Sequence, residues 1–260
     1  MTINNISVLG SGWLGLPIAE YFVSMGAHVK ASTTSKNRFP ELTCSKIEPF
    51  ILNIGCLPNN LHDFLQSKIL IINIPSKNVE GFSILVNEIA KSAIEKVLLV
   101  SSTSVYKNAN KRHYETDDEE LPPSPLLKIE NLFRKNTSFK TTIVRFGGLI
   151  GYKRNPGRFF DKGKLVANPE AYVNLIHRDD CIQIISQIIA QDVWGEVFNC
   201  CADSHPTKRE FYTQAAKQIG APIPNFASAG VNSFKIISNQ KVKRALNYEF
   251  LHPDLMEIQF

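Results

Sequence analysis

The chain has 260 residues, 43% of them hydrophobic and 20% charged, a composition typical of an ordinary globular protein with a sizeable core. Its net charge of +5 comes from 29 basic and 24 acidic residues, an excess that suits a polyanionic ligand but is too diffuse for nucleic-acid binding. No apolar run approaches the roughly 18 residues of a membrane span, and the first one leads directly into glycine, so we expect neither a signal peptide nor a membrane partner.

Short apolar runs alternate with amphipathic stretches in the first part of the chain. Ile6–Leu9 is predicted to be a strand, followed by a helix that ends near Gly26. A second strand lies in "AHVKAS". The runs 68–75 and 96–102 are almost wholly apolar, which is typical of central strands covered on both faces, and the segment between them has helical spacing.

The same alternation continues later in the chain. Thr141–Gly148 is a strand candidate, "DDCIQIISQIIA" a helix, and "GEVFNCC" a last strand. This order predicts an α/β fold with a Rossmann-type, doubly wound parallel sheet.

From about Tyr152 the pattern loosens into a basic loop, "YKRNPGRFFDKGK", and later a helix that ends at Gly220. We therefore expect a small C-terminal substrate lobe built from discontinuous segments. The predicted division is a Rossmann domain over 1–150, continued by about 176–204, and a lobe made of 151–175 and 205–260.

Gly10, Gly12 and Gly15 form G-x-G-x-x-G directly after the first strand and at the start of the first helix. The first glycine permits a tight turn, the second lets a pyrophosphate approach the backbone, and the third allows helix and strand to pack closely. The motif predicts dinucleotide binding, with Ser11, Trp13 and Leu14 completing the loop. The alternative is a fortuitous glycine-rich turn.

The end of the second strand indicates which dinucleotide would bind. The segment "VKASTTSKNRFP" holds no carboxylate to grip a ribose 2′-hydroxyl; it offers hydroxyls at Thr33, Thr34 and Ser35, and charge at Lys36 and Arg38. We therefore expect NADP rather than NAD, the alternative being a solvated basic loop. Ile74 and Pro75 follow a central strand, at the sheet edge where a cofactor would lie.

With "SSTSVY" and "VNLIHRDD" added to the glycine loop, the chain resembles the extended short-chain dehydrogenase/reductases, above all the NAD-dependent epimerase/dehydratase group that acts on nucleotide sugars. The resemblance implies that Ser102 hydrogen-bonds the reacting oxygen of a substrate. It also implies a YxxxK motif about 25 residues later, but Leu126 and Glu130 stand at those positions. None of the seven tyrosines has Lys four residues later, so the chain resembles the atypical branch of that superfamily.

Without this tyrosine, another group would have to handle the hydroxyl proton of a substrate. The titratable candidates are Lys128, Tyr106, His113, Tyr114, Tyr152 and His177. Among them, His177 is also a candidate for orienting substrate or for a buried structural role. Ser102 has a structural alternative too, as a strand-end hydroxyl bonded to nearby backbone.

Several charged residues have both a functional and a structural interpretation. Arg154 and Arg158, with Lys153, could clamp a phosphorylated substrate or form a solvated loop. Asp179 or Asp180 is expected to cap the helix that follows.

The five cysteines have no metal-binding spacing, so we expect reduced, buried thiols in a cytoplasmic protein and no metal site. The favoured function is an NAD(P)-dependent oxidoreductase or epimerase-like protein acting on a small molecule, such as a nucleotide sugar or a small carbonyl compound. The alternative is a non-catalytic NADP(H)-binding sensor or scaffold with a degenerate active site.

Overall fold

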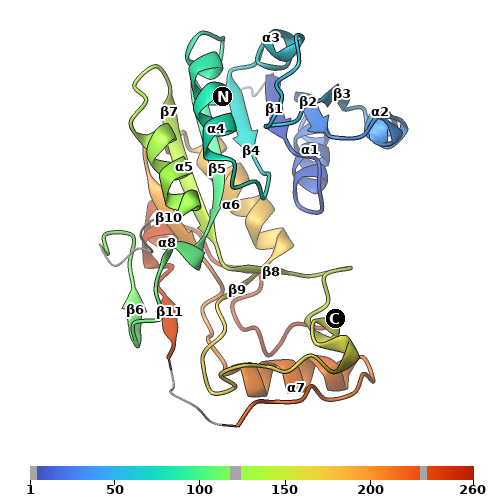
Figure 1. Cartoon of the computed structure of the whole chain (residues 1–260), viewed down its shortest axis with the longest axis vertical. Coiled ribbons are helices and arrows are strands. Elements are labelled where there is room, and N and C mark those ends of the chain that lie inside the picture. Colours follow the sequence, from blue (N-terminus) through green and yellow to red (C-terminus); the bar gives the residue numbers. More distant parts are fainter. Residues whose placement is uncertain (1–4, 118–123, 229–232) are drawn as a thin grey trace. The chain divides into compact units, whose positions relative to one another are not determined.

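The computed structural model describes residues 5–117, 124–228 and 233–260 (Figure 1). The strands are β1 (Asn5–Leu9), β2 (His28–Thr33), β3 (Glu48–Ile51), β4 (Ile69–Ile72), β5 (Lys96–Ser102), β6 (Lys111–His113), β7 (Lys140–Phe146), β8 (Gly148–Ile150), β9 (Leu175–His177), β10 (Val197–Cys200) and β11 (Lys235–Ile237). The α-helices are α1 (Gly15–Ser24), α2 (Phe39–Cys44), α3 (Leu61–Phe64), α4 (Val79–Ala90), α5 (Pro125–Arg134), α6 (Arg178–Ala190), α7 (Lys208–Gln218) and α8 (Gln240–Leu246). Short 3-10 helices are η1 (Lys36–Arg38), η2 (Thr103–Val105), η3 (Pro156–Arg158) and η4 (Asp161–Gly163).

Seven strands form one central sheet in the order β10-β7-β5-β4-β1-β2-β3. The pairs β1–β2, β1–β4, β2–β3 and β4–β5 are parallel, with Ile6 of β1 opposite Val29 on one side and Ile69 on the other. The chain first builds outward from β1 through β2 and β3, then crosses to β4 on the opposite side of β1. The predicted doubly wound fold is confirmed, and its strand order reverses between β1 and β4, where ligands of such sheets bind.

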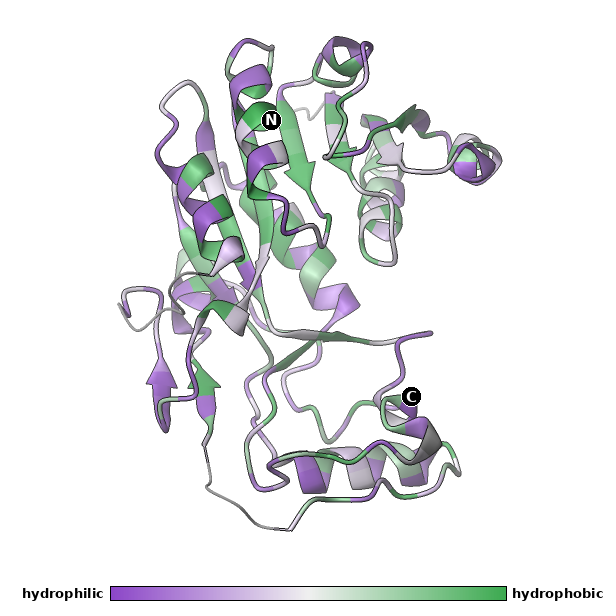
Figure 2. Ribbon diagram, in the orientation of Figure 1, coloured by the Kyte–Doolittle hydropathy of each residue, from purple (hydrophilic) through white to green (hydrophobic). Residues whose placement is uncertain are grey.

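The centre of the sheet is apolar because helices cover its strands. All four residues of β4 are buried, and the strand has the hydrophobic colour in Figure 2. Phe82, Leu85 and Ile89 of α4 belong to the same core cluster as Phe133 of α5. Burial of one such side chain contributes on the order of 1.5–3 kcal/mol, so this packing dominates the stability of the sheet.

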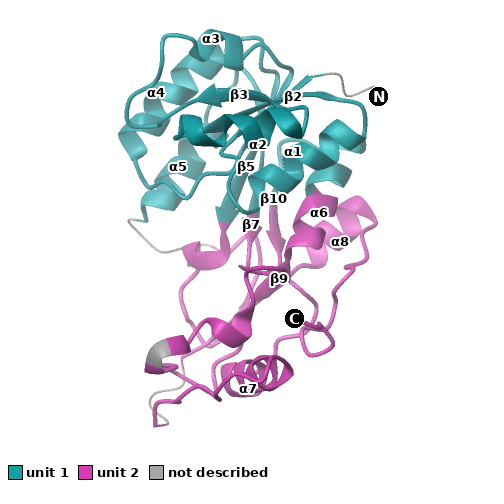
Figure 3. Ribbon diagram, turned by 90° about the vertical axis from the view of Figure 1, so that its right-hand side faces the viewer, with its two compact units in different colours: residues 1–101, 122–144, 185–197 teal, residues 102–121, 145–184, 198–260 magenta. Residues whose placement is uncertain are grey.

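The chain divides into two compact units, shown in different colours in Figure 3. Unit 1 comprises residues 1–101, 122–144 and 185–197, and unit 2 comprises 102–121, 145–184 and 198–260. Unit 2 has its own cluster, in which Ile150, Val166 and Val173 pack with Phe211 of α7 and Leu255 near the C-terminus. The domain boundaries expected from the sequence stay a prediction.

Most differences from the expected elements involve short pieces. The predicted strand 141–148 is split into β7 and β8 at Gly147, where a Cβ atom would lie 2.6 Å from the Asn174 carbonyl oxygen. β3 was not predicted, because four residues that include Pro49 give no clear alternation. The helix expected to end at Gly220 is confirmed as α7, which starts with a capping box between Thr207 and Glu210.

The expectation of buried cysteines is correct only in part. All five cysteines are free; Cys181, Cys200 and Cys201 are buried, whereas Cys44 and Cys56 are exposed. Cys44 is the last residue of α2, and Cys56 lies in a turn after β3, so neither thiol belongs to a buried strand. Within the described residues, no helix combines the length and the apolar character required to cross a membrane.

The loop between β1 and α1 is packed too tightly for most side chains. Gly10 has a φ of +99°, a conformation that glycine adopts without strain. A Cβ atom at Gly15 would lie 1.8 Å from the Gly10 carbonyl oxygen, whereas one at Gly12 would meet nothing within 4 Å. The first and third glycines are therefore required by packing, and the second is not.

We predict that Gly15→Ala lowers the free energy of unfolding by about 3 kcal/mol, as expected for overpacking, while Gly12→Ala changes it by less than about 0.5 kcal/mol. Gly55→Ala is the matched control, because its Cβ would stand at ordinary contact distances of 3.5 and 3.7 Å. Urea denaturation followed by circular dichroism measures all three. Equal midpoints for Gly15→Ala and Gly12→Ala would contradict this reading of the loop.

Candidate functional site

The glycine loop is attached to the end of β2 by two hydrogen bonds. The Gly10 N–H donates to Ser32 Oγ at 2.9 Å, and the Ser11 N–H donates to the Ser32 carbonyl oxygen at 2.9 Å. The carbonyl oxygen of Leu9 also accepts from the Asn73 N–H at 2.8 Å, just after β4. The loop is therefore held between the carboxyl ends of β2 and β4.

The start of α1 offers a place for an anion. Leu14 is its N-cap, no side chain of the described residues caps this end, and the first turn holds no acidic residue. The first turn therefore supplies no negative charge of its own to the positive end of the helix dipole. Beside it, the open space at Gly12 lets a phosphate approach the backbone amides, so the loop fits the diphosphate of a dinucleotide.

Arg38 reaches from η1 to the glycine loop. Its Nη1 donates to the Ser11 carbonyl oxygen and, at 3.3 Å, to Ser11 Oγ. Its Nε and Nη2 donate to one Glu41 carboxylate oxygen at 2.8 and 2.6 Å. The predicted phosphate-binding arginine is therefore positioned at the loop, but a carboxylate missed by the sequence reasoning already pairs with it.

The other residues predicted to bind the cofactor differ in how far they are exposed to solvent. Thr33 is buried, and its hydroxyl bonds within the turn to Ser35. Thr34 and Ser35 are exposed, and Ser35 caps η1 by accepting from the Asn37 N–H. Ile74 lies beneath Gly10, so it supports the loop, whereas Pro75 is exposed. The structure thus brings the predicted cofactor residues of unit 1 to one edge of the sheet.

Ser102 ends β5 and caps η2. Its Oγ accepts from the Ser104 N–H at 3.1 Å, a bond that leaves the hydroxyl hydrogen available to another acceptor. Lys235, which sequence reasoning missed, donates from Nζ to the carbonyl oxygens of Thr103 and Tyr106 at 2.9 and 2.8 Å. Burial lowers the pKa of Lys235 to about 8. This lysine therefore holds the segment that follows Ser102.

The positions of the missing YxxxK motif lie on α5 in unit 1. Leu126 is half-buried, whereas Glu130 is fully buried and accepts a hydrogen bond from Ser101 Oγ. A buried carboxyl group at the lysine position cannot lower the pKa of a phenol, because it would destabilise a phenolate. Glu130 therefore makes a structural contact with Ser101 at the position where the resemblance implied a lysine.

The titratable candidates for the missing phenol differ widely in burial. Tyr106 is buried; its hydroxyl donates to Asn199 Oδ1 at 3.0 Å and accepts from Arg145 Nη1 at 2.6 Å. Burial raises the pKa of Tyr106, which makes it a poor base at neutral pH. His113 is also fully buried and contacts Asp117, whereas Tyr114 and Lys128 are exposed.

The predicted substrate residues of unit 2 fall into two places. Arg154 is exposed and closes a turn with Gly151, and Gly151 also packs directly against the His177 ring. Arg158 is exposed on η3 and lines a different cavity of about 490 Å³, bordered by the segment after α7. Arg154 and His177 are therefore linked through Gly151, whereas Arg158 lines a cavity that includes neither of them.

The acidic pair at the start of α6 does not act as predicted. The helix begins at Arg178, so Asp179 and Asp180 lie inside its first turn rather than capping it. Asp180 is buried and accepts from the Tyr248 hydroxyl, whereas Asp179 faces His177 and His252. Burial, with a smaller contribution from the neighbouring His252, lowers the pKa of His177 to about 4, so this ring is neutral at pH 7.

Comparison with known proteins shows what this fold resembles. No protein-family profile matches the chain. The chain is 29% identical to "Protein YeeZ" of Escherichia coli strain K12 over 272 residues, covering 97% of both chains.

Solved structures give the same fold. MoeE5 in complex with UDP-glucose and NAD superposes with a TM-score of 0.78 at 19% identity, covering 97% of this chain and 96% of that one. A putative NAD-dependent epimerase/dehydratase from Methylobacillus flagellatus also has a TM-score of 0.78, at 20% identity, covering 97% and 94%. The chain therefore has the Rossmann-type fold found in these NAD-dependent proteins.

Proposed function

We propose that this protein is an NAD(P)-dependent enzyme of the oxidoreductase or epimerase type that acts on a small molecule such as a nucleotide sugar. The observation that carries the proposal is the open backbone surface at Gly12, beside the uncapped start of α1 and at the switch point between β1 and β4. A fortuitous turn would not require Gly10 and Gly15 by packing while leaving only the middle glycine free.

A nicotinamide dinucleotide fits the residues present in unit 1. The amides around Gly12 would hold its diphosphate, and Arg38 would meet the adenosine ribose or its 2′-phosphate. The bound nucleotide would supply a carbon that accepts and returns a hydride. The binding of NAD and UDP-glucose by MoeE5, which shares the fold, supports this class of cofactor and substrate.

The chain's own chemistry would centre on Ser102. Its free hydroxyl hydrogen can donate to a substrate oxygen while its Oγ caps η2. Lys235 would act as a positioning residue through its two bonds to the backbone after Ser102. Since Leu126 and Glu130 replace the usual tyrosine and lysine, the second candidate function is a non-catalytic NADP(H)-binding sensor or scaffold.

A side chain placed at Gly12 should weaken cofactor binding. Gly12→Val should weaken binding of reduced dinucleotide at least about 10-fold, because its side chain fills the space left for the diphosphate. Isothermal titration calorimetry with NADPH and NADH measures the affinity, and Gly55→Ala is the matched control. Undiminished binding by a folded Gly12→Val variant would remove the basis of the proposal.

The Arg38–Glu41 pair predicts cofactor preference. Arg38→Ala should reduce NADP affinity by about 10- to 100-fold more than NAD affinity, the effect expected for lost hydrogen bonds to a charged group. Glu41→Gln keeps the arginine and removes its carboxylate partner, so it should shift the preference further toward NADP. Lys91→Ala is the control, because it removes another exposed i,i+3 ion pair, with Glu88, away from the glycine loop.

Because Arg38 also supports the Ser11 backbone, the ratio of the two affinities is the quantity to compare. An unchanged NADP-to-NAD ratio in both Arg38→Ala and Glu41→Gln would contradict the assignment of NADP.

A measurement of substrate turnover distinguishes the proposed enzyme from the alternative, a non-catalytic sensor. With NADP(H) or NAD(H) bound, a panel of nucleotide sugars and small carbonyl compounds should include a substrate, and Ser102→Ala should lower kcat by about 100-fold or more. Ser104→Ala, an exposed neighbour, should leave kcat near the wild-type value. Tight cofactor binding without turnover across the panel would favour the sensor, and unchanged kcat in Ser102→Ala would exclude the role given to this serine.

A further inference from the structure

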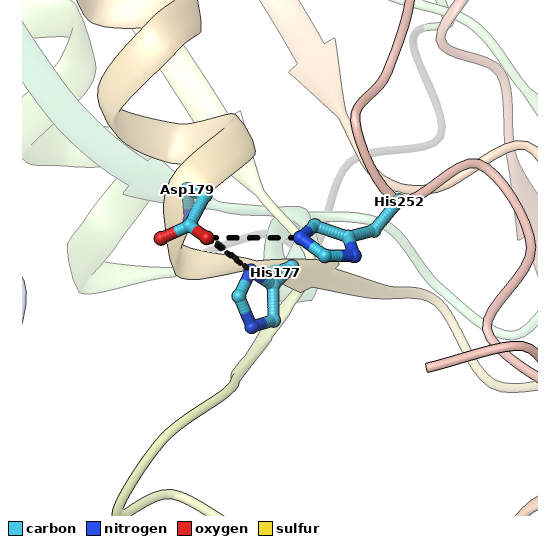
Figure 4. A group of neighbouring side chains, drawn as sticks. All are labelled: His177, Asp179 and His252. Atoms are coloured by element: carbon cyan, nitrogen blue, oxygen red, sulfur yellow. Dashed lines mark hydrogen bonds and ion pairs between the residues drawn. The ribbon is translucent and has the colours of Figure 1, made fainter. Parts of the chain in front are cut away.

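Three side chains from separate segments of unit 2 meet at the start of α6 (Figure 4). His177 ends β9, Asp179 lies in the first turn of α6, and His252 comes from the C-terminal segment. Asp179 Oδ2 is 3.4 Å from His177 Nδ1 and 3.7 Å from His252 Nε2, and the ligand atoms all lie within 4.8 Å of one another. Two imidazoles and one carboxylate thus converge on one small volume.

These separations match those around a metal ion. A tetrahedral zinc site with bonds of about 2.0–2.1 Å to nitrogen and oxygen has ligand atoms about 3.3–3.4 Å apart. The two distances to the Asp179 carboxylate are close to this value. A small movement of His252 toward Asp179 would place the three ligand atoms at three corners of a tetrahedron around the ion. The fourth corner would then be left for water or another ligand.

Nδ1 of His177 faces the cluster. It accepts a long hydrogen bond of 3.3 Å from the Asp179 N–H, a contact that a metal ion at this nitrogen would replace. The other side of the ring packs against Gly151, where a Cβ atom would lie only 2.3 Å from Nε2. The ring is therefore fixed with Nδ1 toward Asp179.

His252 is held in position by the neighbouring carboxylate. Buried Asp180 accepts from the Leu251 N–H at 2.7 Å, the His252 N–H at 3.2 Å and the Tyr248 hydroxyl at 2.7 Å. These bonds tie the C-terminal segment to α6. The third ligand is thus part of a built arrangement rather than a side chain that happens to pass nearby.

The remaining neighbours orient and neutralise the carboxylate. The Tyr152 hydroxyl lies 3.0 and 3.2 Å from the two oxygens of Asp179, the outer-sphere contact typical of metal-binding carboxylates. Arg178 stacks over the Tyr152 ring, with its Cζ 3.8 Å from the centroid. A cation at this helix start would face both Arg178 and the positive helix end, so the negative charge of Asp179 is required to hold it.

We propose that His177, Asp179 and His252 form a binding site for a divalent zinc-type metal ion. Two imidazoles and a carboxylate favour Zn²⁺ over Mg²⁺ or Ca²⁺, which prefer oxygen ligands. The proposal is independent of dinucleotide binding, because all three ligands belong to unit 2 and none belongs to the glycine loop.

The test uses the full-length chain with Cys44→Ser and Cys56→Ser, since these exposed thiols could bind zinc themselves. Calorimetry with Zn²⁺ should show one ion per chain, and Mg²⁺ should show no binding at the same concentration. His252→Ala and Asp179→Asn should each weaken Zn²⁺ binding more than 100-fold. His62→Ala, an exposed histidine on α3, should leave it unchanged.

Two further measurements distinguish the site from nonspecific binding. Tyr152→Phe should weaken Zn²⁺ binding by about 10- to 100-fold, the effect of removing an outer-sphere partner. Co²⁺ bound to the chain with Cys44→Ser and Cys56→Ser should give the intense visible absorption of a four-coordinate ion. The same chain with His252→Ala added should not give this absorption.

Circular dichroism must show that each variant is folded; if His252→Ala is not, Asp179→Asn carries the comparison. No stoichiometric Zn²⁺ binding, or equal binding by His252→Ala, Asp179→Asn and His62→Ala, would overturn the proposal. In that case the three side chains only connect α6 to the C-terminal segment through the ion pair between Asp179 and His252.

Discussion

The close approach of α1 to the end of β1 is the constraint on which the candidate site depends. The Gly15 Cα lies so near the Gly10 carbonyl oxygen that a side chain there would overlap it. This contact places the first turn of α1 over the carboxyl end of the sheet, beside the point where strand order reverses. The backbone amides, the helix dipole and the open surface at Gly12 then face the same region.

Two positions on α5 differ from the pattern that the resemblance implied. Where the resembled enzymes place a tyrosine and a lysine, this chain has Leu126 and a buried Glu130 bonded to Ser101. Tyr106 cannot replace the missing phenol, because its hydroxyl is buried between Asn199 and Arg145. Leu126 and Glu130 therefore offer neither a phenol nor an ammonium group at these two positions.

The fold could be predicted from sequence because apolar strands and the glycine spacing are local patterns. Ile6–Leu9, the run ending at Pro75 and the glycines at 10, 12 and 15 each carry their signal within a few residues. Glu41 and Lys235 could not be found this way, since Arg38 and the backbone after Ser102 meet them only in the folded chain. The same holds for His252, which lies 73 residues after Asp179 in the sequence and beside it in the structure.

The proposed function requires that the amides of the glycine loop hold the diphosphate of a nicotinamide dinucleotide. Amide chemical shifts of ¹⁵N-labelled protein, recorded as NADPH is added, test it most directly because they locate the ligand on the backbone. We expect the largest changes at Gly10–Gly15, with smaller ones near Arg38 and after β4. Saturating NADPH that shifts other amides and leaves this loop unmoved, or shifts none, would contradict the account.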